Sequence, residues 1–162
     1  MLLRIKALLA AGLLVPLLGL ATVAEARTSH GIGFDAVRYL DQAQDGDQLN
    51  LSWQVSTGRR SALVVGIADG DQYQMYEAGF KRYNEKYLSG SFYQLGVSYW
   101  NGSSGVSSEL GMDIRVGYEI PLSRWAVITG SVGTVYGVDT PENSSSSLPL
   151  VFRPHLGVIF HF

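Results

Sequence analysis

Cysteine is absent from the 162 residues of this chain. A disulfide framework and a cysteine-ligated metal centre are therefore excluded. Charged residues are also few, at 16% of the chain. The 12 lysines and arginines nearly balance the 14 acidic residues, which gives a formal net charge of −2. This balance lacks the basic excess of a nucleic-acid-binding surface, so we expect no nucleic-acid partner.

Long apolar runs are absent after the first 26 residues. The stretch Ala7–Val23 is uncharged, follows Arg4 and Lys6, and precedes Ala24-Glu25-Ala26. This pattern predicts a secretory signal peptide over residues 1–26, cleaved after Ala26; the alternative is a single membrane anchor. No later run reaches the length of about 20 residues that a membrane helix needs. A membrane protein built from residues 27–162, one domain's worth of chain, must therefore be a β-barrel.

The clearest pattern that is present lies in the last 13 residues, LVFRPHLGVIFHF. Every second residue from Leu150 to Phe162 is apolar, and the residues between them are mostly polar or small. A strand alternates its side chains between two faces, so this segment has one apolar and one mixed face. Outer-membrane barrels close with such a strand, whose apolar face meets lipid and whose other face lines the lumen.

Seven earlier segments alternate in the same way, which predicts eight strands in all. The mature chain is therefore expected to be an all-β, eight-stranded antiparallel up-and-down transmembrane β-barrel. The predicted strands are Gly31–Leu40, Asp47–Ser56, Ser61–Ala68, Tyr73–Tyr83, Phe92–Trp100, Ser108–Ile120, Trp125–Tyr136 and Leu150–Phe162.

The connections between these segments alternate in charge. Residues 57–60 and 121–124 are net basic, and so is 84–90 when the adjacent Lys81 and Arg82 are counted with it. The other four connections are acidic or uncharged and contain no lysine or arginine. An up-and-down meander produces this alternation, because alternate turns emerge at opposite ends. With both termini periplasmic, the basic turns are periplasmic and the acidic loops face outside.

The alternation alone leaves open which face points outward. In a soluble barrel such as a lipocalin the apolar face points inward, and a soluble periplasmic lipid-binding barrel is the alternative. Charges in mid-strand on the polar face and the terminal Phe162 favour the membrane version. Aromatic residues near strand ends then predict interfacial girdles: Trp53, Tyr73, Tyr76, Tyr93, Tyr99, Trp125, Tyr136, Phe160 and Phe162.

These features together resemble the small eight-stranded bacterial outer-membrane barrels of the OmpX, Ail and OmpA transmembrane-domain type. The resemblance is carried by the leader, the eight alternating segments, and the closing strand ending Phe160-His161-Phe162. It implies a location in the outer membrane of a Gram-negative bacterium, with membrane lipids and lipopolysaccharide as neighbours. It also implies that Phe160 and Phe162 belong to a signal read by the barrel assembly machinery. We expect the protein to be a monomer. Because the resemblance is one of architecture and not of a specific motif, it says little about activity.

The inward face is the first candidate functional site. A barrel of eight strands is too narrow for an open pore, so side chains fill its lumen, and buried charges there must pair. We expect a structural polar network that plugs the lumen, the alternative being a gated ion path or a plug in which His155 titrates. The charged residues with lumen parity are Asp35, Glu77, Lys81, Glu109, Asp113, Arg115, Glu119, Arg153 and His155.

Two further functions are alternatives to this network. A lipid A deacylase or acyltransferase remains an alternative, but the sequence shows no serine, histidine and acid in a recognisable constellation. The acidic loops, with Asp41, Asp45, Asp47, Asp69 and Asp71, could bind a divalent cation, but they lack the full calcium-loop pattern. We therefore expect no catalytic residue and no cofactor, and a structural or surface-interaction role in the cell envelope.

Overall fold

The structure is a computed structural model of the chain, and it describes residues 28–40, 48–70, 72–102, 107–138 and 150–162. The predicted signal peptide and most of the acidic loops lie outside these residues. The domain boundary after Ala26 therefore stays a prediction.

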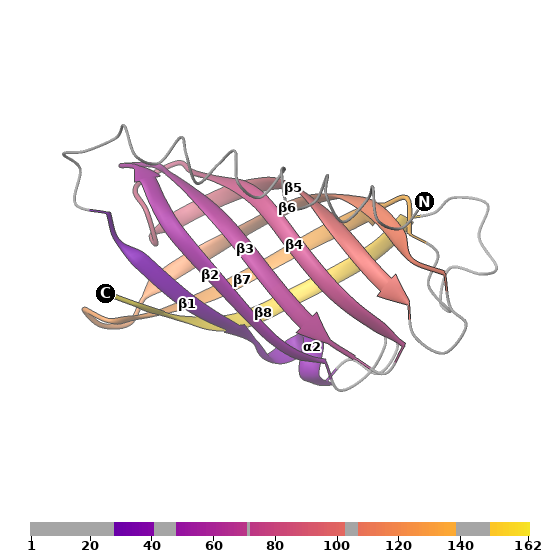
Figure 1. Cartoon of the computed structure of the whole chain (residues 1–162). Coiled ribbons are helices and arrows are strands. Elements are labelled where there is room, and N and C mark those ends of the chain that lie inside the picture. Colours follow the sequence, from indigo (N-terminus) through magenta and orange to yellow (C-terminus); the bar gives the residue numbers. More distant parts are fainter. Residues whose placement is uncertain (1–27, 41–47, 71, 103–106, 139–149) are drawn as a thin grey trace.

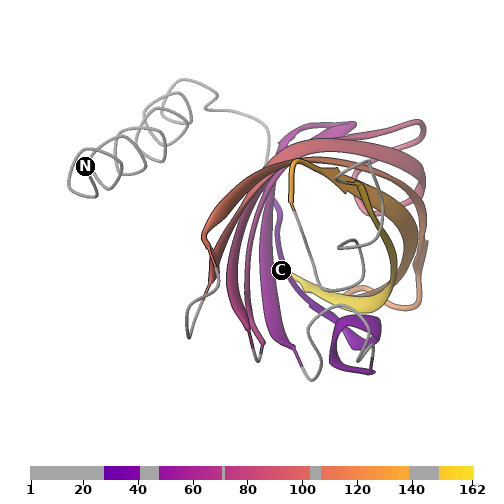
Figure 2. The ribbon, with the colours of Figure 1, turned by 90° about the vertical axis from the view of Figure 1, so that its right-hand side faces the viewer.

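Eight antiparallel strands form one closed barrel in simple chain order, as Figures 1 and 2 show from the side and from one end. The predicted fold class is confirmed, and most strand ends fall within two residues of their expected places. The strands are β1 (His30–Asp35), β2 (Leu49–Gly58), β3 (Ser61–Asp69), β4 (Tyr73–Tyr83), β5 (Gly90–Gly102), β6 (Glu109–Pro121), β7 (Ala126–Tyr136) and β8 (Leu150–His161).

Pairing of β1 with β8 closes the barrel. The backbones of His30 and Phe162 exchange two hydrogen bonds of 3.0 Å each, so the first and last strands begin and end at the same rim. Figure 1 shows the C-terminus and the turns that join β2 to β3, β4 to β5 and β6 to β7 at this left-hand end. These are the three basic connections, and we call this end the basic rim.

The first strand is shorter than predicted. The prediction of a strand over Gly31–Leu40 is wrong beyond Asp35, where the chain turns into the short helix α2 (Ala36–Leu40). The Asp35 carboxylate accepts a hydrogen bond from the Val37 amide at 3.0 Å, which is the contact of a helix N-cap. The Asn50 side chain bonds the amide and carbonyl of Asp35, at 2.8 and 2.7 Å, where β1 stops. A side chain thus replaces the missing strand partner.

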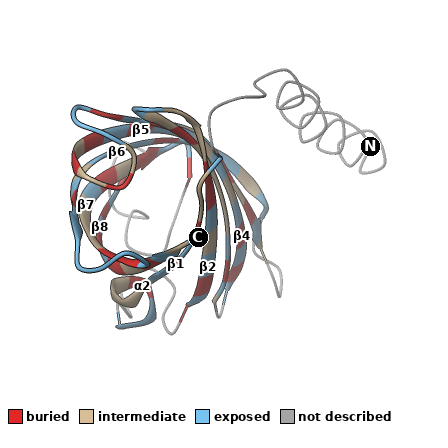
Figure 3. Ribbon diagram, turned by 90° about the vertical axis from the view of Figure 1, so that its left-hand side faces the viewer, coloured by how far each residue is buried: buried red, intermediate tan, exposed pale blue. Residues whose placement is uncertain are grey.

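The outer face of the barrel is an apolar belt, and buried and exposed residues alternate along the strands in Figure 3. An apolar surface that encircles the molecule is unlike that of a soluble monomer, and it is opposite to the inward apolar face of a soluble lipid-binding barrel. The described part of the chain contains no helix with the length and hydropathy to cross a membrane. All eight strands contribute exposed apolar side chains to the belt, among them Phe34, Leu51, Ile67, Phe80, Leu95, Ile114, Val132 and Phe152.

The lumen is not polar throughout, contrary to the simplest reading of the inward face. Apolar clusters fill both ends, and the aromatic residue Tyr73, predicted to belong to an outer girdle, is buried inside. Large inward side chains fit there because the strands are tilted and staggered, so residues from distant strands meet at one height. At the end away from the basic rim the cluster comprises Ala68, Tyr73, Met75, Trp100, Val135, Val138 and Val151. At the basic rim two clusters comprise Ala62, Tyr83 and Phe92, and Leu88, Val127 and Ile159.

The connection between β4 and β5 folds back into the mouth of the barrel. Tyr87 packs against both rim clusters, and its ring meets that of Tyr83 edge-on at 5.8 Å. Its amide donates a 2.8 Å hydrogen bond to the Arg59 carbonyl, and burial raises the pKa of its phenol, so the ring stays neutral. Leu88 is 4% exposed with φ of 63°, a strained conformation for a residue with a side chain. We call Tyr87 and Leu88 the turn plug.

Candidate functional site: the charged lumen

Charged side chains occupy the middle of the lumen, between the apolar clusters at its two ends. Along β4 the inward residues run from Met75 through Glu77 and Lys81 to Tyr83, so both charges lie between apolar neighbours. The ionic groups are thus largely shielded from solvent. In such surroundings a charge must find an opposite charge or a hydrogen bond, because its isolated burial is costly.

Glu77 is the centre of the network. It pairs with Arg38 of α2, with Arg153 of β8 at 3.3 Å and with Arg115 of β6 at 3.7 Å. Three cations from different parts of the chain thus converge on one carboxylate. Because each contact joins elements distant in sequence, the network ties α2, β4, β6 and β8 together across the lumen.

Arg38 was not among the predicted lumen residues. On an extended strand its parity would have placed it on the lipid side, but α2 turns the side chain inward, where it is 8% exposed. Burial by itself lowers the pKa of Arg38, but the neighbouring carboxylates of Glu77, Asp35 and Asp113 raise it above its ordinary value overall. The guanidinium therefore remains charged. The N-cap residue Asp35 is the sequence signal that could have revealed this helix.

His155 and Asp35 form the second contact group. The imidazole Nδ1 lies 2.5 Å from Oδ2 of the carboxylate, whose other oxygen accepts the Leu156 amide at 3.2 Å. Arg38 lies near the same carboxylate, with Nε 3.7 Å from Oδ2. Asp35 thus fastens the end of β1 to β8 at the closure of the barrel.

Lys81 and Glu119 form a separate pair nearer the basic rim. The ammonium contacts the carboxylate directly and lies 3.8 Å from the ring centroid of Phe92. Both side chains are almost fully buried. A cation over an aromatic face gains electrostatic attraction, which adds to that of the ion pair.

The remaining predicted residues are Arg115, Asp113 and Glu109. Arg115 lies 3.6 Å from Asp113, its neighbour but one on β6, without a hydrogen bond between them. Glu109 stands at the far end of β6, where it accepts a long hydrogen bond of 3.5 Å from Ser107, away from the central network. The structure therefore brings eight of the nine predicted residues together inside the barrel, leaves Glu109 apart, and adds Arg38.

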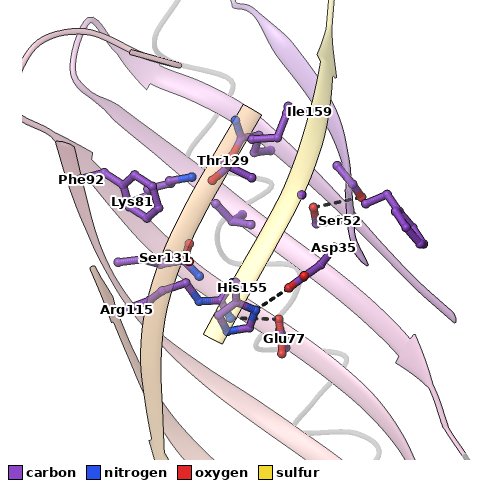
Figure 4. Close-up of a pocket in the computed structure, with 16 residues that line it drawn as sticks. Asp35, Ser52, Glu77, Lys81, Phe92, Arg115, Thr129, Ser131, His155 and Ile159 are labelled. Atoms are coloured by element: carbon purple, nitrogen blue, oxygen red, sulfur yellow. Dashed lines mark hydrogen bonds and ion pairs between the residues drawn. The ribbon is translucent and has the colours of Figure 1, made fainter. Parts of the chain in front are cut away.

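A chamber of about 70 Å³ lies among these groups. Figure 4 shows Arg115, His155, Asp35 and Glu77 at one side of it and Lys81 at the other. A water molecule needs about 10–15 Å³ of such space, so the chamber has room for several waters or a small ion.

A metal site was not found among the described residues, where no three histidine or acidic side chains are arranged to hold an ion. Of the acidic loop residues weighed for cation binding, Asp69 is described, exposed, and lies 3.5 Å from the Gln74 amide nitrogen. The residues Asp41, Asp45, Asp47 and Asp71 lie outside the described ranges, so that alternative stays untested.

Comparison with known proteins identifies the architecture. No protein-family model matches the chain, and no curated protein matches it. A solved structure, the N-terminal β-barrel domain of OprF from Pseudomonas aeruginosa, is similar with a TM-score of 0.58 and 12% identity. The match covers 83% of this chain and 95% of that one. At this identity the likeness establishes the fold, that of a small eight-stranded barrel of the outer-membrane type.

Proposed function

We propose that this chain is an outer-membrane protein of a Gram-negative bacterium, with a structural or surface-interaction role in the cell envelope. The observation that carries the proposal is the apolar belt, to which all eight strands contribute exposed side chains. In lipid such a surface is stable, and the closed ladder leaves no strand edge unpaired around the ring. The OprF likeness supports the same reading.

The filled lumen supports a role other than that of an open pore. Apolar clusters occupy both ends, and ion pairs occupy the middle. Eight strands leave an interior that side chains can fill, in contrast to the wide aqueous channels of larger barrels. We propose that the plugged barrel holds its shape in the membrane and interacts through its outer surface and loops.

We further propose that the protein is not an enzyme. The best-formed acid–histidine pair, Asp35 with His155, lies within the enclosed lumen, away from the outer surface that lipid A could reach. His30, by contrast, stacks between Trp53 and Phe162 at the basic rim, which suits a packing role. A lipid A-modifying activity is the rival that the experiment below addresses.

The test begins with cell fractionation. The proposal expects the protein in outer membranes, resistant to extraction by osmotic shock, with a band that shifts on gels when the sample is heated. Mass spectrometry of lipid A from cells with and without the protein then separates the two functions. An unchanged acyl pattern supports the structural role, a changed pattern establishes the enzyme, and release by osmotic shock overturns the membrane location.

Outer-membrane lipids, lipopolysaccharide and the barrel assembly machinery are the proposed partners. The Phe162 backbone pairs with His30, and Phe160 stacks on Trp125 at 5.7 Å, so both terminal aromatics lie at the basic rim. Deleting Phe162 should reduce the amount of assembled, heat-modifiable protein in cells, while the purified truncated chain still refolds in detergent. Normal assembly of the truncated chain in cells would contradict the role of this signal.

A further inference from the structure

The basic rim carries four exposed cations on two adjacent turns, the one between β2 and β3 and the one between β4 and β5 (Figure 1). Two backbone hydrogen bonds of 2.8 Å join these turns, with the carbonyls of Arg59 and Arg60 as acceptors. The backbone therefore gathers the four charges at one place on the rim. We call this group the cationic patch; it comprises Arg59, Arg60, Arg82 and Lys86.

The charges of the cationic patch are not compensated. Every lysine and arginine of the lumen lies within 4 Å of a carboxylate, whereas no ion pair in the described part of the chain involves a residue of the patch. The acidic residue of these two turns, Glu85, accepts a 3.5 Å hydrogen bond from Ser89, and its carboxyl group packs beside Gly90. Glu85 is thus turned toward its own turn, and the patch keeps a net positive charge that attracts anions.

Arg82 places the cationic patch at the edge of the apolar belt. It points outward from β4, on the same face as Phe80 two residues earlier. Its register partner on β5 is Tyr93, whose outward side chain is 45% exposed. Side chains directly opposite in an antiparallel pair are neighbours, so an acyl chain lying on Phe80 and Tyr93 ends beside the guanidinium. Tyrosine at a membrane border lies at the level of the lipid headgroups.

We propose that the cationic patch binds the phosphate of an anionic phospholipid, with Arg82 in contact with the phosphate and the acyl chains on the adjoining belt. A guanidinium suits this ligand because it can donate two parallel hydrogen bonds to a phosphate. A lipid is favoured over a soluble anion because Arg82 shares the outward face of Phe80 and Tyr93. A phospholipid is favoured over lipopolysaccharide because the basic turns are expected on the periplasmic side, where the leaflet consists of phospholipids. The inference rests on the proposed membrane location.

Native mass spectrometry of the purified barrel in a non-ionic detergent measures the binding. Phosphatidylglycerol and phosphatidylcholine with the same acyl chains are compared, because both have the phosphate but only the first has a net negative charge. We expect phosphatidylglycerol to bind more tightly. Arg82→Gln should weaken its binding about fivefold, the contribution of one basic residue at an anionic membrane surface, and leave phosphatidylcholine binding unchanged. The matched control Arg124→Gln removes an equal charge from the same rim, in the turn between β6 and β7, and should retain the preference.

Equal binding of the two phospholipids would overturn the proposal. An equal loss in Arg82→Gln and Arg124→Gln would also overturn it, because the attraction would then be to the total charge of the rim. So would a preference for lipid A over phosphatidylglycerol that Arg82→Gln removes, or cosedimentation with purified peptidoglycan in place of lipid binding. Cell fractionation separates this inference from the proposed function. A barrel that stays in outer membranes without preferring phosphatidylglycerol refutes the lipid site alone, whereas release by osmotic shock refutes the membrane location.

Discussion

Arg38 of α2 donates a hydrogen bond to Glu77 of β4 inside the barrel, across 39 residues of sequence. The contact exists because β1 stops at Asp35 and the following helix turns the arginine inward. One local event, the capping of a short helix, thereby provides the central carboxylate with a buried cation.

Replacing Arg38 by alanine should destabilise the barrel. Removing one partner of a buried ion pair leaves an uncompensated charge and costs about 3 kcal/mol, the lower end of the usual range, because Arg153 still contacts Glu77 at 3.3 Å. Chemical denaturation in detergent measures the change. Arg82→Ala, at an exposed position, should change stability by less than about 0.5 kcal/mol. In a double-mutant cycle with Glu77→Gln, additive effects would show that the pair contributes nothing.

The turn plug should protect the chamber from reagents in solution. Because the chain has no cysteine, Ser131→Cys places a single thiol on the chamber wall. Thiol reaction depends on exposure, so labelling by a methanethiosulfonate should be slower than that of the exposed turn position Ser123→Cys by on the order of tenfold. Adding Tyr87→Ser and Leu88→Ser should accelerate labelling of the chamber thiol and leave the Ser123→Cys control unchanged. Equal rates with and without the plug would show that it does not close the chamber.

The inward Gly117 should tolerate no side chain. A Cβ there would lie 2.7 Å from the Phe92 ring and still closer to the Ser131 Cβ. Gly117→Ala should therefore cost about 1–3 kcal/mol through overpacking. Gly130→Ala is the matched control, because a Cβ on that glycine meets nothing nearer than Leu156 at 3.9 Å. Unfolding free energies of the two variants test this, and equal costs would contradict the close packing at Gly117.

A charge on the apolar belt should be expensive in a bilayer. Leu95 lies midway along β5 on the outer face and is 51% exposed. If this face meets lipid, Leu95→Lys should destabilise the barrel, lowering its free energy of unfolding in liposomes by about 2–4 kcal/mol. Asn101→Lys, an exposed position near the strand end, should cost about 0–1 kcal/mol. A cost for Leu95→Lys as small as that of a surface change in water would contradict the membrane proposal.

Period-two patterns were sufficient to predict the number of strands, their order and the division of most strand residues between two faces, but not the inward positions of Arg38 and Tyr73. Alternation is a local property, because each strand residue points opposite to its neighbours whatever lies beside the strand. For this reason Glu77, Lys81, Arg153 and His155 could be assigned to the lumen from sequence, and the basic turns could be assigned to one rim.

Only the tertiary structure decided which inward side chains from different strands lie at the same height in the lumen and contact one another. Strand stagger and barrel closure determine which inward residues meet, and these depend on pairings far apart in the chain, such as that of β1 with β8. The apolar clusters at both ends, the inward fold of Tyr87 and Leu88, and the three arginines around Glu77 all arise in this way. The sequence by itself determined which residues share a face of the barrel wall. Closure of the barrel determined which inward side chains contact one another in the lumen.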